Sequence, residues 1–331
     1  AGSRKSESFL RAYAESAKRL EAAGGPFSTL TTNHILEDAA NKAMLSRFAQ
    51  AAPTWTLICE QKPLDDFKPH NLYRLDSNLG YLKLQPQGEL QHGRLSDTKR
   101  SVQADTYGRI ISLDRHHVIN DDLGAFAQLI NGLSDGSIWA IESAVYALLL
   151  ANASSIFSVG NGNLIDNVLD LAGLEAAEES FGSHVTADGR PITFEPDRLL
   201  VGTALASTAR QLVSPQLLAS DANSGQVSLQ NVFAGRFQVV KTPYLNNTSI
   251  RTPEGDALSN QSDTLWFILG NPSRGAVVTV GLLGGRSVPT IQSNETSFQT
   301  LGMQWRGYHD FGVAQGDEEY GVMSTGDASG G

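Results

Sequence analysis

The stretch DTYGRIISLDRHHVINDDLGAFAQLINGLSDGSIWAIESAVYALLLANA, residues Asp105–Ala153, decides how this chain folds. Its first residues alternate between apolar and polar side chains, which predicts a strand that ends near Leu113. Asn120, Asp121 and Asp122 then form a polar corner of the kind that caps a helix. After this corner the apolar side chains recur every three to five positions along one stripe: Leu123, Phe126, Ile130, Leu133, Ile138, Ile141, Val145 and Leu148. The pattern predicts one helix over about 121–153, roughly 45 Å long at ~1.5 Å per residue.

Three glycines, Gly124, Gly132 and Gly136, fall inside this helical pattern. Each costs about 1 kcal/mol of helix stability relative to alanine. Such residues either let a neighbouring backbone approach closely or allow a bend. We therefore predict that the helix is kinked or interrupted between Gly132 and Gly136.

The string YGRIISLDRHHVINDDLGAF, with the helix that ends in ALLLANA, resembles the major head protein of Mu-like tailed bacteriophages and prophages. Two later segments share the resemblance: Pro196–Val201, which precedes a predicted helix, and Phe237–Leu245, a strand that meets Pro243. The resemblance implies an α+β fold of the Hong Kong 97-like phage capsid type. In that fold a strand returns from an extended loop and enters a long spine helix.

The same resemblance implies a division of the chain into an arm, a loop and two domains. The expected parts are an N-terminal arm at 1–54, an extended β-hairpin E-loop at 77–104, a peripheral (P) domain at 55–76, 105–197 and 286–326 with the spine helix at about 121–153, an axial (A) domain at 198–285, and a disordered tail at 327–331. The residues support one part of this independently, because 77–104 is polar and too poor in apolar side chains to bury a core of its own.

Two amphipathic helices are predicted before Pro53, one at 4–23 and one starting at the cap residue Asn33. Neither has a neighbour close in sequence that would cover its apolar stripe, so each docks either on the body of the chain or on another subunit. From this reasoning and the resemblance, we expect intersubunit contacts at Phe9, Tyr13, Tyr81, Lys83, Lys99 and Arg100. For Lys99 and Arg100 we expect salt bridges between subunits.

Further strands and helices follow from local composition. Strands are predicted at Trp55–Cys59, Leu72–Leu75, Arg198–Gly202, Phe237–Leu245, Thr264–Leu269, Ala276–Leu283 and Thr296–Val313. Helices are predicted at Asp166–Phe181 and after Thr203, which would be the cap. Asp317, Glu318 and Glu319 are expected to form a solvated turn.

Composition restricts the function classes. The net charge of −10 argues against a protein that grips nucleic acid through a basic patch. A single cysteine, Cys59, cannot form an intrachain disulfide and reads as a small buried apolar side chain. No apolar run approaches 18 residues, which predicts no membrane span, and the polar N-terminus has no signal-peptide pattern.

No motif for catalysis, nucleotide binding or metal binding occurs in the sequence. His116 and His117 are adjacent in a strand-like segment, where side chains face opposite ways and do not chelate one metal easily. Asp121 and Asp122 suit a helix cap better than a paired catalytic site. We therefore expect no catalytic residue, no metal and no cofactor.

The resemblance implies a structural protein that assembles with itself into hexamers and pentamers of an icosahedral shell around double-stranded DNA. Implied partners are a portal, a scaffold or prohead protease and decoration proteins; the DNA would be enclosed without sequence-specific binding. The implied location is the virion capsid, assembled in the bacterial cytoplasm. Two alternatives stay open: an encapsulin-like compartment of the same fold that binds cargo enzymes, and an enzyme whose site has no recognised motif.

Overall fold

The computed structural model describes residues 41–77, 95–114, 123–151, 153–185, 191, 195–214, 218–219, 228–229, 231–295 and 302–327. The chain forms two compact units. Unit 1 takes its described residues from Ala1–Pro53, Asp105–Ala140 and Arg286–Phe311, and unit 2 takes its own from Thr54–Ala104, Ile141–Gly285 and Gly312–Gly331.

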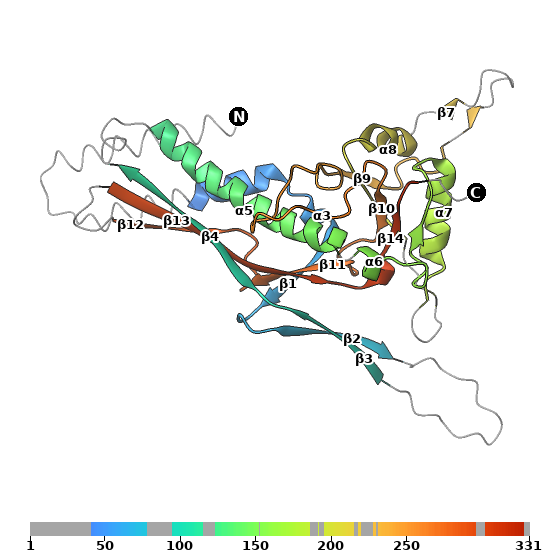
Figure 1. The fold of residues 1–331 in the computed structure, drawn as a ribbon, viewed down its shortest axis with the longest axis horizontal. Helices are drawn as coiled ribbons and strands as arrows, with labels where there is room; N and C mark the ends of the chain where they lie inside the picture. Colours follow the sequence, from blue (N-terminus) through green and yellow to red (C-terminus); the bar gives the residue numbers. More distant parts are fainter. Residues whose placement is uncertain are drawn as a thin grey trace, which may run out of the picture. The chain divides into compact units, whose positions relative to one another are not determined.

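The long helix predicted at about 121–153 is α5, Leu123–Ala151, with 29 residues. It passes Gly132 and Gly136 without a break (Figure 1), so the predicted interruption is wrong. A Cβ added to either glycine would have nothing within 4 Å, which also excludes close packing of a described neighbouring backbone at these positions. Both glycines lie on an exposed face of the helix, where nothing forces the chain to deviate.

Unit 1 is built around three antiparallel strands. β13 (Gly302–Gln315) pairs with β4 (Asp105–Asp114) on one side and with β12 (Thr290–Glu295) on the other. Helical residues 41–51 and the first part of α5 contribute to the core of this unit, where Met44, Ile130, Ile291 and Trp305 are buried together. Of the two predicted N-terminal helices, the described part of the second therefore docks on the body of its own chain.

Unit 2 begins with a helical turn, α3 (Trp55–Ile58), where a strand was predicted for Trp55–Cys59. That prediction is wrong, because the tertiary surroundings favour a helix there. Trp55 and Ile58 are both buried, as residues three apart on one helical face can be, and the preceding Thr54 is held by the carboxylate of Glu142. The strand starts later, as β1 (Cys59–Leu64), which pairs in parallel with β11 (Val278–Leu283).

Two further strands of unit 2, β2 (His70–Ser77) and β3 (Leu95–Val102), form a separate antiparallel pair. They lie side by side (Figure 1), and the register runs from His70↔Val102 to Ser77↔Leu95. We call this pair the ribbon. The ribbon begins at His70, seven residues before residue 77, where the expected E-loop begins.

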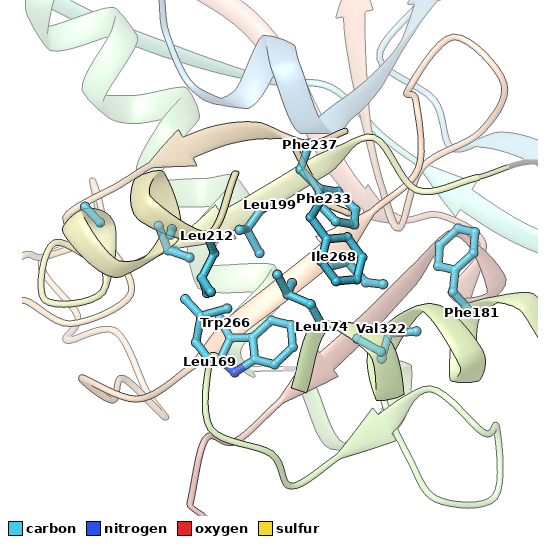
Figure 2. Close-up of a cluster of buried hydrophobic side chains, with 14 residues drawn as sticks. Leu169, Leu174, Phe181, Leu199, Leu212, Phe233, Phe237, Trp266, Ile268 and Val322 are labelled. Carbon is cyan, nitrogen blue, oxygen red and sulfur yellow. The ribbon is translucent and has the colours of Figure 1, made fainter. Parts of the chain in front are cut away.

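The second sheet of unit 2 has the order β5-β14-β10-β6-β9. Its strands are β5 (Leu164–Ile165), β14 (Gly321–Ser324), β10 (Trp266–Leu269), β6 (Arg198–Val201) and β9 (Gln238–Lys241). Two helices, α7 (Leu171–Gly182) and α8 (Ala206–Val213), contribute to the apolar cluster on this sheet, which includes Trp266, Ile268, Leu199 and Phe181 (Figure 2). All five strands are short, β10 and β14 are buried at every position, and β6 is buried at all but Arg198, so these three strands lie in the interior of unit 2.

The caps of both helices differ from the sequence-based expectation. Asp170 caps α7 by accepting a hydrogen bond from the Gly173 amide at 2.7 Å, so the helix starts at Leu171 and not at Asp166. α8 starts at Ala206 and its cap residue, Leu205, makes no side-chain hydrogen bond, so the prediction of Thr203 as a cap is wrong. The remaining short elements are α6 (Ala153–Ile156), β7 (Leu218–Ala219), β8 (Ser228–Leu229) and the 3₁₀ turn η1 (Glu318–Tyr320).

One described helical window, Gln128–Ala151 of α5, is long and apolar enough to cross a membrane by length and composition. The sequence predicts no span, because no uninterrupted apolar run approaches 18 residues. Half of the window is buried inside the structure. A single such helix is weak evidence for a span, since the core helix of a globular protein meets the same criteria.

Candidate functional site

Several residues of the predicted apolar stripe of α5 lie in the interior of the unit to which they belong. Ile130, Ile141 and Val145 are buried, and Leu133 packs in the core of unit 1 beside Gly307. Phe126 lies in α5 but its side chain is outside the described residues, as are the predicted cap residues Asn120, Asp121 and Asp122. The predicted cap therefore stays a prediction.

In unit 1, α5 is also held by polar contacts that the sequence analysis did not find. Arg47 donates two hydrogen bonds, each of 2.9 Å, to the two carboxylate oxygens of Asp135. The pair is exposed, so its contribution to stability is small. The pair joins the described N-terminal helix, 41–51, to α5 at a defined position along both helices.

A second polar contact in unit 1 involves a buried histidine. His309 Nδ1 lies 2.9 Å from the Ser137 hydroxyl, and its Nε2 lies 3.2 Å from the Arg286 carbonyl oxygen. A neutral ring that donates from Nε2 and accepts at Nδ1 satisfies both partners. Burial lowers the pKa of His309 below its ordinary value, which favours this neutral form.

In unit 2, the second part of α5 carries a half-buried carboxylate, Glu142. Its Oε1 accepts from the Thr54 amide at 2.6 Å and from the Thr54 hydroxyl at 2.7 Å, and that hydroxyl lies 2.8 Å from the Tyr146 hydroxyl. The Tyr146 ring stacks on Tyr244 with centroids 4.9 Å apart. The only sequence signal for this network was a charged residue next to Ile141 in an otherwise apolar stripe.

Cys59 lies near this network and is almost fully buried. Burial, and secondarily the charge of Glu142, raise the pKa of the thiol well above its ordinary value. The thiol is therefore protonated and inert at neutral pH, as expected for a small apolar core side chain.

The root of the ribbon presents two different faces. His70, Leu72, Arg100 and Val102 alternate with the exposed Asn71, Lys99 and Ser101. On the inner face Val102 is buried with Leu64, Ala104 and Ala314, and Leu72 packs against this cluster. The exposed outer face includes Lys99, one of the predicted contact residues.

Arg100, also a predicted contact residue, makes its observed contacts within its own chain. Its guanidinium donates to the Gly316 carbonyl oxygen, to Asp317 Oδ1 at 2.8 Å and to Glu318 Oε2 at 2.9 Å. Asp317 and Glu318, expected in a solvated turn, are therefore half-buried acceptors for this arginine. An intersubunit salt bridge of Arg100 would have to compete with these bonds.

Four of the predicted contact residues, Phe9, Tyr13, Tyr81 and Lys83, lie outside the described residues. Across the described parts of the chain, no three histidine, cysteine or carboxylate side chains come together in a way that would hold a metal ion. The contacts described here hold α5 and the ribbon in position. None of these contacts assembles a reactive group with a base.

Comparison with known proteins gives one family match and several similar structures. Residues 97–324 match the phage capsid protein family. No curated protein matches the chain in sequence.

Two solved capsids have TM-scores above 0.5. The capsid structure of the cyanophage P-SCSP1u has a TM-score of 0.54 at 10% identity, over 82% of this chain and 86% of that one. The mature capsid of bacteriophage PhiM1 has a TM-score of 0.52 at 11% identity, over 80% of this chain and 84% of that one. At these identities the two structures are evidence for a shared fold alone.

Proposed function

The chain belongs to the phage capsid protein family, and from this premise we propose that copies of it form the hexamers and pentamers of an icosahedral shell around double-stranded DNA. It is a major capsid protein of a tailed phage and a structural component of the shell. The observation that carries the proposal is the family match over 97–324, a range that includes α5 and every strand from β4 to β14.

Within the family, we assign the chain to the Mu-like head proteins with a Hong Kong 97-like fold. The support is the sequence of the strand-to-helix entry, Tyr107–Phe126, together with the 29-residue helix that follows it. In this assignment α5 is the spine helix and the ribbon is the root of the E-loop. The N-terminal arm and the axial domain keep the boundaries expected from the sequence, and the first segment of the peripheral domain ends before His70, where the ribbon begins.

We place the contacts between subunits on the arm and the E-loop. The support in the described chain is the exposed outer face of the ribbon, where the ammonium group of Lys99 is free to meet a neighbour's carboxylate. Phe9 and Tyr13 on the arm, and Tyr81 and Lys83 on the loop, are the other proposed contacts. Many weak contacts of this kind, repeated by symmetry, produce a stable closed shell.

The proposed partners and location follow from the same role. A portal, a scaffold or prohead protease and decoration proteins would interact with the assembled shell, and assembly would take place in the bacterial cytoplasm before the protein becomes part of the virion. The net charge of −10 suits a wall that encloses DNA without binding it tightly.

Electron microscopy tests the proposed assembly directly. The purified protein, fractionated by size and viewed in negative stain, should yield icosahedral particles or hexameric capsomers. Monodisperse monomers under every salt and concentration condition would overturn the proposal. Copurified nucleic acid with portal or tail components distinguishes a phage shell from an encapsulin-like compartment, which would bring a single cargo enzyme.

A loop replacement tests the role of the E-loop. Ser77↔Leu95 is the outermost pair among the described residues of the ribbon, so an Asn-Gly turn in place of 78–94 would close the described ribbon as a tight hairpin. The variant should keep the melting temperature of the wild type and lose particle formation. A matched control replaces 78–94 by a scrambled sequence of equal length and composition. Normal particles from the hairpin variant would contradict the proposed contacts.

A further inference from the structure

The contacts of Arg100 point to a conformational device at the root of the ribbon. Arg100 is only partly exposed, with 20% of its side-chain surface accessible, and it has three acceptors in one short segment, Gly316–Glu318. We propose that these bonds form an ionic latch that sets the direction in which the ribbon leaves the body, and thereby presents the ribbon to a neighbouring subunit. The second half of this inference rests on the proposed function.

The acceptor side of the latch is a fixed platform. The Gly316 and Asp317 amides donate to the carbonyl oxygens of Val277 at 2.7 Å and Ala276 at 2.9 Å. A Cβ on Gly316 would lie 2.1 Å from the Ala276 carbonyl oxygen, so the two backbones pack closely there. At the other end of the segment Gly316–Glu318, Asn163 Nδ2 donates to the Glu318 carbonyl oxygen at 3.1 Å. The backbone that carries the three acceptors is therefore hydrogen-bonded to the body of unit 2 independently of the ribbon.

The described root of the ribbon is also attached through an apolar contact. Val102 and Leu72 pack on Leu64, Ala104 and Ala314. Apolar contacts have little directionality, so they hold the root in place but resist rotation weakly. Hydrogen bonds from a planar guanidinium to several fixed acceptors are directional. Arg100 is thus the directional contact between the ribbon and the segment Gly316–Glu318 on which the proposed latch depends.

Because the ribbon is long, a small rotation at its root moves its far end by several ångströms. From the pair Leu72↔Arg100 to the pair Ser77↔Leu95 the ribbon runs five further residues on each strand. At ~3.4 Å per residue this is about 17 Å, so a 10° rotation at the root would move the far pair by about 3 Å. A displacement of that size exceeds a hydrogen-bond length, and it would misplace any contact that the ribbon makes with a neighbour.

Hydrogen exchange on the unassembled chain tests the latch without reference to the shell. Arg100→Gln removes the charge and the fork of donors, and Glu318→Gln weakens the acceptor side with a smaller change. Lys99→Gln is the matched control, because it removes one positive charge from the adjacent, exposed position. We expect the ribbon amides beyond Leu72 to exchange about five- to tenfold faster in both latch variants and unchanged in the control.

The amides of β10, which do not depend on the latch, report whether each variant is folded. Raising the salt concentration should also accelerate exchange in the wild-type ribbon relative to β10, because salt screens partly exposed ion pairs. Equal ribbon exchange in wild type, Arg100→Gln and Glu318→Gln, with β10 protected, would overturn the latch.

Assembly kinetics test the consequence. Light scattering should show several-fold slower particle formation by Arg100→Gln and by Glu318→Gln than by the wild type. If the latch variants change ribbon exchange but not assembly, the latch exists and does not present the ribbon. If the wild type forms no particles at all, the proposed function fails, whereas the exchange result still decides the latch.

Discussion

Replacing Gly132 and Gly136 in α5 by alanine should stabilise the unassembled chain. Both glycines are exposed, both lie inside the helix, and an added Cβ has nothing within 4 Å at either position. The substitution therefore removes the conformational-entropy cost of glycine without introducing a clash. Each replacement should raise the free energy of unfolding by about 1 kcal/mol, and the double variant by about 2 kcal/mol.

The measurement is thermal unfolding of the unassembled subunit, followed by circular dichroism at 222 nm. For a chain of 331 residues, 2 kcal/mol corresponds to an increase in Tm of about 3 °C. Gly312→Ala is the opposing control, because its Cβ would lie 1.8 Å from the Gln103 carbonyl oxygen and must lower the Tm. An unchanged or lower Tm in the double variant would refute the argument that these glycines face open space in a regular helix. A stabilised variant that forms no particles would instead indicate that the assembled state needs a bend there.

Three further predictions concern single residues. Burial lowers the pKa of His309, so as the pH falls the unfolded chain binds a proton at this residue before the folded chain does. The free energy of unfolding should therefore be highest above pH ~6.5 and decrease as the pH drops toward the lower pKa of the folded state. Urea midpoints measured against pH should show this decrease, and the decrease should be smaller in His309→Gln. Gly316→Ala should destabilise the chain by about 2 kcal/mol or more, since its Cβ meets the Ala276 carbonyl oxygen, and a wild-type urea midpoint would contradict this. Cys59 should react with a thiol reagent only after unfolding, because it is buried and its thiol stays protonated; stoichiometric labelling within minutes in native buffer would disprove it.

Long periodic elements were predictable from the sequence. α5 has a sustained apolar stripe without proline, and the structure places the stripe residues Ile130, Ile141 and Val145 in the interior. Strands β6, β10 and β11 lie inside the segments predicted for them, because runs of branched and aromatic side chains between turn residues have few alternatives.

Short elements and ionic contacts were not predictable, for physical reasons that differ. Trp55–Ile58 has strand-forming residues, but Glu142, 88 residues away along the chain, binds Thr54 and favours a helical turn. Arg100 and its acceptors are more than 200 residues apart, so sequence alone could not show that its contacts are internal. For Gly132 and Gly136, the sequence indicates the free-energy cost of glycine in a helix. It does not show that both positions face open space, where no neighbour interrupts the helix.

The ribbon has a consequence for the free subunit. β2 and β3 pair only with each other among the described strands, so no described strand covers the outer edge of either one. Such edges are templates on which identical chains add to one another and grow into fibres. On β3, however, every residue from Ser96 to Ser101 is polar or charged, including Asp97, Lys99 and Arg100. Hydration of these side chains and their charge repulsion oppose open-ended growth, so that subunits at the high concentration needed for a closed shell stay dispersed until they meet in the correct geometry.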